Sequence, residues 1–356
     1  MPDHDFLLYG ANGYTGRLIA RAASEKGLKP LLAGRKGDEV AALGRELGLP
    51  HLEMRLDEGE KLDEALHTCG FALHAAGPFR HTLRPMVDAC LRTGRHYVDI
   101  NGDISCFEEV RTYHQAALDK GIMLLPGAGF DVIPTDCLAA FLHRQMPNAN
   151  RLRIAFASVG STLSHGTAMT MAGKLGEGGM IRKGGQIVRR PFGEHGMTID
   201  LGDGPRFVMS IPWGDVSTAY HTTGIPDIEA FTAVKPLIHR ILKFQSLFNG
   251  LLRKEWVRDR IRRKIDGRAP GPDDAMRRQA RSLVWAEVTG ADGKACTATL
   301  RGPEVYDLTA LGALLVAQKI GQGDLRPGYQ TPAGCYGPDL VLGIPGVERK
   351  GPFRNE

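Results

Sequence analysis

The chain has 356 residues, of which 42% are hydrophobic and 24% are charged, a composition typical of soluble globular proteins. This length exceeds that of one ordinary hydrophobic core, so we expect two domains. The formal net charge of +5 is too small to indicate a nucleic-acid partner unless it is concentrated on one face. No apolar run approaches the roughly 18 residues of a membrane span, and the N-terminus lacks the pattern of a secretory signal. We therefore expect a cytoplasmic protein.

The metal-ligating residue types are scattered. The six cysteines form no Cys-x-x-Cys pair, and the twelve histidines show neither His-x-His nor His-x-x-x-His spacing. Scattered cysteines are typical of a reducing compartment rather than a disulfide framework. We expect no metal site.

Short apolar runs alternate with helical segments over the first 125 residues. The runs DFLLY, KPLLA, HLEMRL, FALHAA, HYVDI and IMLLP are separated by segments such as YTGRLIARAASEKG and GDEVAALGRELG. Six strands separated by helices predict an α/β fold with a Rossmann-type, doubly wound parallel sheet and right-handed crossovers.

A glycine triplet follows the first predicted strand and opens the first predicted helix. Gly10 permits a tight turn, Gly13 lets the backbone approach a pyrophosphate, and Gly16 lets the helix pack closely on the strand. The phosphates then lie at the helix N-terminus, where free N–H groups favour negative charge. A purely structural turn is the alternative. The predicted cofactor-binding residues of this segment are Gly10, Asn12, Gly13, Tyr14, Thr15 and Gly16.

The residues after the second strand predict which dinucleotide binds. An acidic residue at that place binds the ribose of NAD, whereas arginine accommodates the 2′-phosphate of NADP. Here Arg35 and Lys36 follow Gly34, and no carboxylate precedes Asp38. A solvated helix start is the alternative, but helix starts favour negative charge. We predict NADP (NADPH) as the cofactor.

The fourth strand ends in small residues, which leave room for the nicotinamide ribose, and Phe79 is placed to cover the ring. The predicted cofactor-binding residues here are Ala76, Gly77, Pro78 and Phe79. The segments AAGPF, HYVD, GYTGRL, AGR, PGAGFDVIPTD, SHGT, HTTGIPDIEAF and TPAGCYG together resemble the saccharopine dehydrogenase-like oxidoreductases. This resemblance implies two domains, with the last thirty residues packing back on the nucleotide domain.

After residue 127 the pattern changes to longer strands and hairpins. The strands are expected at RLRIAFAS, RFVMSIP, DVSTAYHTTGI, SLVWAEVTG and KACTATLRG, with an Asp292-Gly293 hairpin turn and helices near 167–176 and 305–320. We predict an NADP-binding domain over 1–127, completed by about 327–356. A second α+β domain with a mixed or antiparallel sheet, for substrate and dimerisation, is predicted over 128–326.

Four residues are candidates for proton transfer beside the nicotinamide. Asp99 ends the fifth strand, Tyr97 shares its face, and Asp131 lies just past the sixth strand. His165 lies at a predicted helix start and is able to act as a general acid near pH 7. The alternatives are helix capping for Asp99, backbone binding for Asp131, a core position for Tyr97 and pocket shaping for His165.

Residues 237–266 form a basic amphipathic stretch. They include nine Lys or Arg and three Asp or Glu, a net charge of +6, and their apolar residues lie near one helical face. An ordinary packed helix is one interpretation. The other is a docking surface for an anionic membrane, coenzyme A or an acyl carrier. Nucleic acid is not expected, because no aromatic run accompanies the charges.

The sequence therefore favours an NADPH-dependent reductase that transfers hydride to an electrophilic C=C, C=O or C=N. The family that the chain resembles includes enzymes acting on amino-acid imines and trans-acting enoyl reductases. A dicarboxylate-rich substrate requires clustered arginines in the second domain, and the only basic cluster there lies at 237–266. We therefore expect a small or acyl-type substrate, carrier- or coenzyme A-linked, and the antiparallel sheet of such second domains favours a homodimer. Two alternatives stay open: a non-catalytic or weakly active dinucleotide-binding protein associated with lipid surfaces, and an imine-reducing amino-acid dehydrogenase of the opine or saccharopine type.

Overall fold

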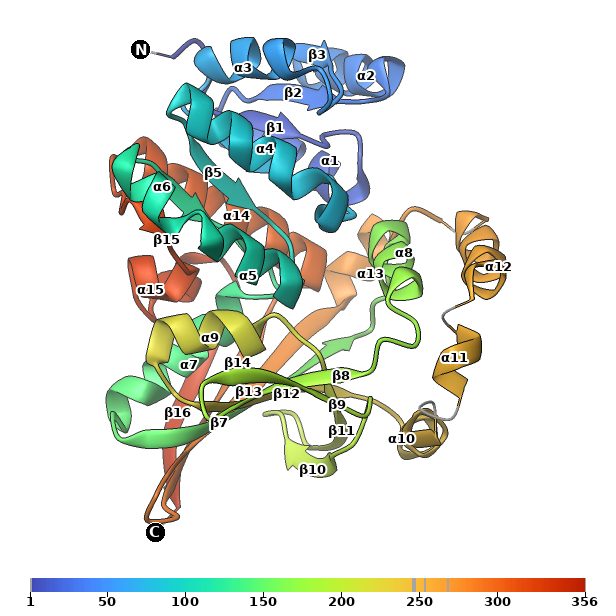
Figure 1. Ribbon diagram of the computed structural model, residues 1–356, viewed down its shortest axis with the longest axis vertical. Coiled ribbons are helices and arrows are strands. Elements are labelled where there is room, and N and C mark those ends of the chain that lie inside the picture. The colour runs from blue at the N-terminus through green and yellow to red at the C-terminus, as the bar shows by residue number, and fades with distance from the viewer. Residues whose placement is uncertain (1, 245–247, 253, 268, 356) are drawn as a thin grey trace. The chain divides into compact units, whose positions relative to one another are not determined.

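The computed structural model describes residues 2–244, 248–252, 254–267 and 269–355 (Figure 1). The chain forms two units. Met1–Ile133 and Tyr306–Cys335 make the first, and Pro134–Val305 and Tyr336–Glu356 make the second.

The first unit is a parallel sheet between two layers of helices. Its elements in chain order are β1 (Leu7–Tyr9), α1 (Tyr14–Glu25), β2 (Leu31–Gly34), α2 (Gly37–Leu47), β3 (His51–Glu53), α3 (Gly59–His67), β4 (Phe71–His74), α4 (Phe79–Thr93), β5 (His96–Asp99), α5 (Ile104–Thr112), α6 (His114–Asp119), β6 (Met123–Leu125), α14 (Val305–Gly321), β15 (Gly328–Tyr329) and α15 (Pro332–Tyr336). The strand order is β15-β6-β5-β4-β1-β2-β3, and all pairs are parallel. This confirms the predicted doubly wound sheet.

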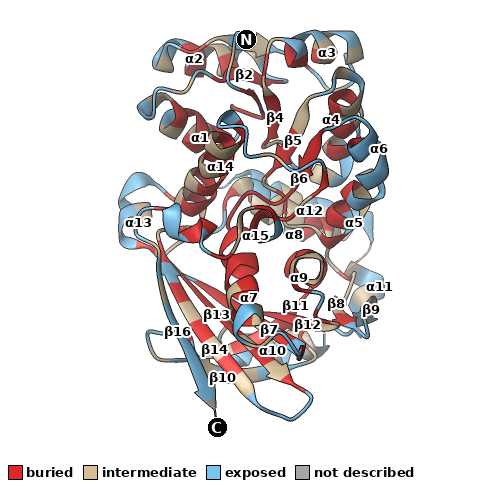
Figure 2. Cartoon of the chain, turned by 90° about the vertical axis from the view of Figure 1, so that its left-hand side faces the viewer, coloured by how far each residue is buried: buried red, intermediate tan, exposed pale blue. Residues whose placement is uncertain are grey.

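The short strands are apolar because both faces of this sheet are covered. Helices α1, α2 and α14 lie on one face and α3, α4, α5 and α6 on the other in both views (Figures 1 and 2). Every residue of β1, β2 and β4 is buried (Figure 2). The carboxyl ends of β1, β2, β4 and β5 therefore lie along one edge, where ligands of such sheets bind.

The second unit is built on a mixed nine-stranded sheet. Its elements are α7 (Ile133–Gln145), β7 (Ala149–Val159), α8 (His165–Gly173), β8 (Gly179–Lys183), β9 (Gln186–Arg190), β10 (Gly196–Asp200), β11 (Pro205–Ile211), α9 (Asp215–Thr223), β12 (Asp227–Ala233), α10 (Pro236–Lys243), α11 (Asn249–Leu252), α12 (Glu255–Asp266), α13 (Asp274–Gln279), β13 (Arg281–Gly290), β14 (Ala295–Gly302), η2 (Leu340–Gly343) and β16 (Glu348–Asn355). The main path is β10-β11-β12-β7-β13-β14-β16, with the β8–β9 hairpin joined through β12. Only the pair of β12 and β7 in this sheet is parallel among the described residues. This agrees with the mixed sheet expected for the second domain.

One predicted strand is wrong. The segment from Asp215 forms α9, and the strand β12 follows it, because Gly224 ends the helix in the left-handed conformation with φ of +72°. A carboxylate in the first turn and a glycine after the last turn are the usual helix signals. These two helix signals outweigh the alternation of β-branched residues, which had predicted a strand.

The predicted division of the C-terminal region is corrected as well. The chain returns to the first unit with Tyr306–Cys335, and Tyr336–Glu356 belongs to the second unit. The reason is that β16 pairs with β14 along most of its length, from Glu348 opposite Arg301 to Asn355 opposite Ala295. The first boundary falls after Ile133 rather than after residue 127.

Candidate functional site

The loop between β1 and α1 has the geometry that a phosphate-binding turn requires. Gly10 has φ of +88°, and a Cβ there would fall 2.8 Å from the backbone nitrogen of Ala76. A Cβ on Gly16 would fall 2.1 Å from the carbonyl oxygen of Gly10. Both positions therefore exclude any side chain. Gly13 has φ of −70°, and a Cβ there would meet only the Gly10 oxygen, at 3.2 Å. A Cβ at Gly13 would therefore be tight against one backbone oxygen, but far less so than a Cβ at Gly10 or Gly16.

Helix α1 presents an uncompensated N-terminus beside this loop. Its first turn holds no acidic residue, and no side chain caps it. Tyr14 and Thr15 occupy its first two positions, and Arg17 Nε donates to the carbonyl oxygen of Asn12 at 3.0 Å. An anion is the natural complement of such a helix end. The predicted residues of this segment thus lie together around one turn.

The segment after β2 carries the two predicted basic residues, both exposed. Arg35 makes no ion pair with any residue that the structure describes. Lys36 Nζ donates to Glu39 Oε1 at 2.8 Å, and Asn12 Nδ2 donates to Glu39 Oε2 at 3.0 Å. The hydrogen bond from Lys36, and after it the one from Asn12, lowers the pKa of the Glu39 carboxyl group below its ordinary value. Arg35 is therefore the basic residue available to a 2′-phosphate, whereas Lys36 is engaged by Glu39.

The turn after β4 is held by His74, which sequence reasoning did not single out. Thr82 Oγ1 donates to the carbonyl oxygen of Ala76 at 2.7 Å and lies 3.0 Å from His74 Nε2. The Phe79 ring stands edge-on to the imidazole, with centroids 5.1 Å apart. Because the Thr82 hydroxyl proton goes to Ala76, His74 Nε2 is the donor of that pair. The imidazole thus fixes the loop of Ala76–Phe79, which includes the cis peptide bond between Gly77 and Pro78.

His74 is neutral, since complete burial lowers its pKa to about 3. The sequence feature that could have identified His74 is its place as the last residue of an otherwise apolar strand, because a buried polar residue there needs a hydrogen-bond partner.

Asp99 and Tyr97, two of the predicted catalytic residues, are brought together and fully buried. Tyr97 Oη donates to Asp99 Oδ2 at 2.6 Å, and Asp99 Oδ1 accepts the N–H groups of Asn101 and Gly127 at 2.9 and 2.8 Å. Burial raises the pKa of both groups. The Asp99 carboxylate is thus surrounded by internal donors and ties the loop after β5 to the loop after β6. This arrangement favours a structural role over proton transfer.

Asp131 and His165, the other two candidates, lie in different units. Asp131 is half-buried, and a Cβ on Gly102 would fall 2.1 Å from its Oδ2, so the carboxylate lies directly against the Gly102 backbone. His165 is the first residue of α8, after the N-cap Ser164. Its Nε2 lies 3.0 Å from Asp266 Oδ1 of α12. Because His165 and Asp266 are 101 positions apart, the sequence did not predict that they form a pair.

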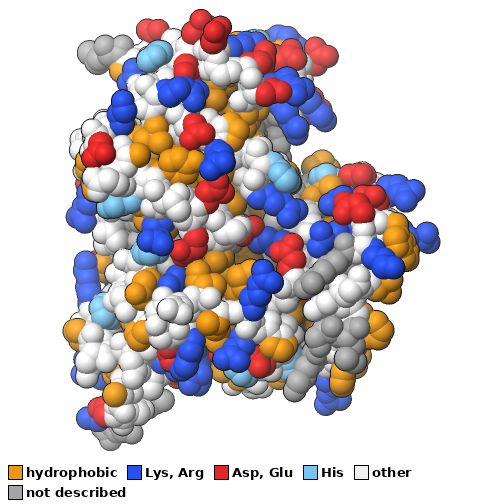
Figure 3. All heavy atoms as spheres, in the orientation of Figure 1, with side chains coloured by type: hydrophobic (Ala, Val, Ile, Leu, Met, Phe, Trp, Pro, Cys, Tyr) orange, Lys and Arg blue, Asp and Glu red, His pale blue; other side chains and the backbone are white. Residues whose placement is uncertain are grey.

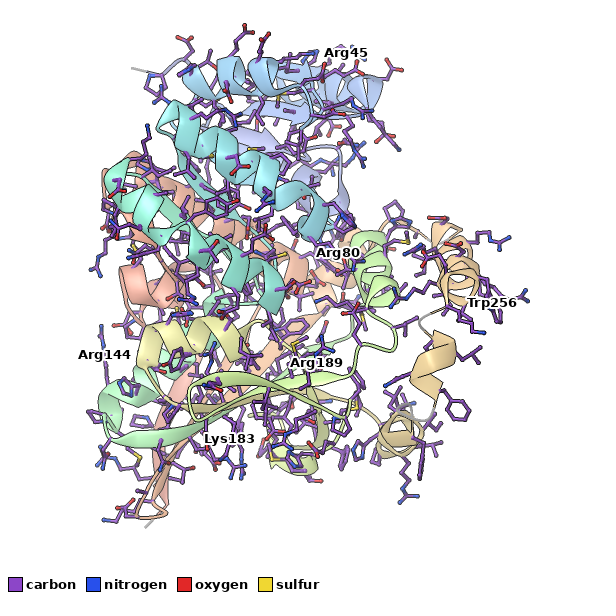
Figure 4. All side chains as sticks on the ribbon, in the orientation of Figure 1. Arg45, Arg80, Arg144, Lys183, Arg189 and Trp256 are labelled. Atoms are coloured by element: carbon purple, nitrogen blue, oxygen red, sulfur yellow. The ribbon has the colours of Figure 1, made fainter. Side chains whose placement is uncertain are left out.

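The second unit holds a cavity of about 410 Å³ whose lining combines charged and apolar side chains. Its lining includes Arg151, Arg182, Lys183 and Arg190, together with three carboxylates (Lys183 is marked in Figure 4). The sequence predicts that the only basic cluster of this domain lies at 237–266. That prediction is wrong, because the lining of this cavity is a second group of basic residues. The Arg182 guanidinium is nevertheless already hydrogen-bonded within the protein, since it donates to the carbonyl oxygens of Val216 and Gly185, each at 2.7 Å. Lys183 pairs with Asp227.

Two further features of the described residues bear on the chemistry. They contain no group of three or more His, Cys, Asp or Glu side chains arranged to hold a metal ion. No helix among them has the length and apolar composition needed to cross a bilayer.

These observations define a class: the first unit is a nucleotide-binding Rossmann domain with its loop, helix end and basic residue at one edge of the sheet. Residues 6–125 match the family model "Saccharopine dehydrogenase NADP binding domain". The first unit is therefore an NADP-binding domain that is similar, over these residues, to that of the saccharopine dehydrogenases.

Curated relatives match a similar share of the chain. A trans-acting enoyl reductase of Mycobacterium leprae is 29% identical over 152 residues, which cover 40% of this chain and 36% of the relative. A human saccharopine dehydrogenase-like oxidoreductase is 27% identical over 160 residues, 39% of this chain and 37% of the relative. The matched region thus spans just over a third of the length of these relatives.

The fold is similar to a solved structure over nearly the whole chain. Apo saccharopine dehydrogenase (L-Glu forming) of Saccharomyces cerevisiae matches with a TM-score of 0.68, covering 97% of this chain and 99% of that one at 13% identity. At this identity the likeness establishes the two-unit fold and not the substrate.

Proposed function

We propose that this protein is an NADPH-dependent reductase that transfers hydride to an electrophilic double bond of an acyl-type substrate. The observation that carries the proposal is the set of glycines around Gly10–Gly16 with Arg35 unpaired beside it. NADPH, when bound, supplies the hydride; the chain binds it, orients it and provides a proton.

We assign each part of the NADPH molecule to a different segment of the first unit. The backbone around Gly13 and the N-terminus of α1 bind the pyrophosphate. Arg35 binds the 2′-phosphate, with several donors and a permanent charge. The loop of Ala76–Phe79, fixed by His74 and Thr82, lies against the nicotinamide end. Because His74 is neutral and buried, it holds this loop without adding charge beside the reacting atoms.

For the proton we propose His165 as the donor, with Asp131 as the second candidate. Asp266 accepts a hydrogen bond from His165 Nε2 and orients the ring. In the imidazolium form both nitrogens carry a proton, so Nδ1–H donates its proton to the substrate while Nε2–H stays bonded to Asp266. Replacement of His165 by Gln is expected to lower kcat with little effect on NADPH affinity. The same measurement on Asp131→Asn distinguishes the two candidates.

An acyl substrate, free or bound to a carrier or to coenzyme A, is favoured over an amino-acid imine with several carboxylates. A receptor for such an imine requires several available arginines. In the second-unit cavity Lys183 pairs with Asp227 and Arg182 is bound to two carbonyl oxygens, and three carboxylates line the same cavity. The names of the mycobacterial relatives point the same way. Oxidation of NADPH with a panel of enoyl, keto and imine substrates tests this proposal. Turnover of imines alone would refute the acyl assignment, and tight NADPH binding without any turnover would favour the non-catalytic alternative.

The proposal includes a homodimer in the cytoplasm. The second sheet ends in the edge strands β10 and β16, and exposed edge strands are surfaces on which sheets pair. Sedimentation equilibrium of the purified protein measures the oligomeric state, and fractionation of the source cells measures the location.

A further inference from the structure

Helices α10, α11 and α12 carry an unusual share of the exposed apolar side chains. Among the described residues, twelve large hydrophobic side chains are exposed, and seven of them lie between positions 237 and 256. They are Leu237, Ile238, Ile241, Phe244, Phe248, Leu251 and Trp256. The three helices follow one another along one side of the second unit (Figure 1), where apolar atoms also gather in the space-filling view (Figure 3). Apolar patches of this kind mark interaction sites.

The orientation of α10 explains this exposure. His239, on its inner side, contacts the carbonyl oxygen of Gly193 through Nε2 at 2.8 Å, and its ring lies 5.1 Å from that of Phe207. With this residue turned inward, Leu237 and Ile241 on the opposite side are 65% and 64% exposed. The helix is therefore anchored by a polar contact and turns its apolar side to solvent. The interpretation of this stretch as an ordinary packed helix does not hold for α10.

Positive charge accompanies the apolar side chains. Arg240, Lys254, Arg260 and Lys264 are exposed and form no ion pair with a described residue. The acidic residues of the same stretch are engaged internally. Glu255 and Asp259 pair with Arg262, and Asp266 pairs with His165. The surface thus combines apolar side chains with uncompensated cations.

We propose that the outer side of α10–α12 docks on an anionic lipid bilayer, with its apolar side chains in the headgroup region and its cations on the lipid phosphates. This combination is typical of helices that lie in a membrane interface, and Trp256, at the outer side of α12 (Figure 4), is a residue type enriched there. An acidic carrier protein would use the cations but leave the seven apolar side chains in water. A bilayer uses both.

The experiment is flotation of the full chain with vesicles of phosphatidylcholine and phosphatidylglycerol in equal amounts, and with phosphatidylcholine alone. The wild type is expected to float with the anionic vesicles. The triple variant Leu237→Ser, Ile241→Ser, Phe244→Ser is expected to lose more than about tenfold in partitioning, since each buried apolar side chain contributes to insertion. A matched control, Leu118→Ser, Leu342→Ser, Phe353→Ser, removes three exposed apolar side chains elsewhere and is expected to bind as the wild type does.

A second variant tests the charges. Arg260→Gln with Lys264→Gln is expected to weaken binding to anionic vesicles and to reduce its salt dependence. Absence of wild-type flotation, or equal flotation of the two triple variants, overturns the proposal. So does a wild-type dimer that the α10 triple variant dissociates, because the surface would then be covered by a second copy. NADPH titration of each variant is a separate measurement, so failure of the proposed cofactor binding and failure of docking are distinguishable.

Discussion

At the scale of single residues, the three glycines of the first loop differ in what an added side chain would contact. Gly16 makes room for the Gly10 carbonyl, whereas a Cβ at Gly13 would meet only that same oxygen, at 3.2 Å. We therefore expect Gly13→Val to abolish most NADPH binding while the melting temperature stays close to that of the wild type. Gly16→Ala is expected to lower the melting temperature markedly. Unchanged NADPH affinity of Gly13→Val in a fluorescence titration would remove this loop from the site.

The proposed role of Arg35 is to select NADPH over NADH by binding the 2′-phosphate. Arg35→Gln removes a charge-assisted hydrogen bond to the 2′-phosphate and is expected to weaken NADPH binding by about 2 kcal/mol. NADH affinity is expected to change little, because NADH has no phosphate at that position. Arg45→Gln, an exposed arginine in the last turn of α2 (Figure 4), is the matched control. A wild type that prefers NADH in calorimetric titration would contradict the assignment.

His74 makes the stability of the protein pH-dependent. Its folded pKa of about 3 lies below the ordinary value of 6.5, so the unfolded state binds the additional proton between these two values. This contribution to stability is present above pH 6.5 and is lost as the pH falls toward 3. We expect the free energy of unfolding to fall by up to about 1.4 kcal/mol per pH unit from this group in that window.

His74→Gln tests this dependence, since its amide N–H is able to replace the donor to Thr82 without titrating. Urea unfolding of both proteins from pH 7 down to about pH 4 is expected to show a flatter profile for the variant. Parallel profiles would mean that His74 is not the titrating group.

At the scale of elements, α9 shows how a helix is ended by a single glycine. Gly224 has φ of +72°, and an alanine in this conformation costs about 1 kcal/mol. We expect Gly224→Ala to reduce the free energy of unfolding by this amount in urea. Gly267, which follows α12 with φ of −83° and has open space around its Cβ position, is the control. Gly267→Ala is expected to be neutral or slightly stabilising, and an equal loss for both would refute the explanation.

The basic stretch is an element whose interpretation changes with the structure. It forms three helices rather than one, and Arg258 is not a solvated charge, since it donates to the carbonyl oxygen of Leu175 at 2.9 Å. Arg262 is paired with Glu255 and Asp259. Variants meant to remove surface charge without loss of stability therefore belong at Arg260 and Lys264.

At the scale of the whole molecule, NADPH is expected to act on the first unit. A ligand that binds only the folded state adds RT ln(1 + [L]/Kd), about 2.7 kcal/mol at a hundredfold excess over Kd. We expect slower hydrogen exchange at residues 10–16, 34–39 and 74–82 on NADPH addition, measured by mass spectrometry. Protection confined to the second unit would place the cofactor elsewhere.

The sequence by itself determined the six-stranded part of the first unit that residues 1–125 form, but not its completion by Tyr306–Cys335. Six apolar runs with glycines at the first turn specify a parallel sheet and its loop, because backbone strain and burial on both faces allow few other residues there. The Asp292-Gly293 turn between β13 and β14 was predictable for the same local reason.

Tertiary structure decided what depends on distant partners. The pairing of β16 with β14 assigns the C-terminus to the second unit, and the contact between His165 and Asp266 joins α8 to α12. The structural surroundings of Asp99 and the neutral state of His74 arise from burial by the whole sheet. The outward turn of α10 follows from one contact of His239. Hydrophobic periodicity gives the width of an apolar face, but only packing decides whether that face is turned to the core or to solvent.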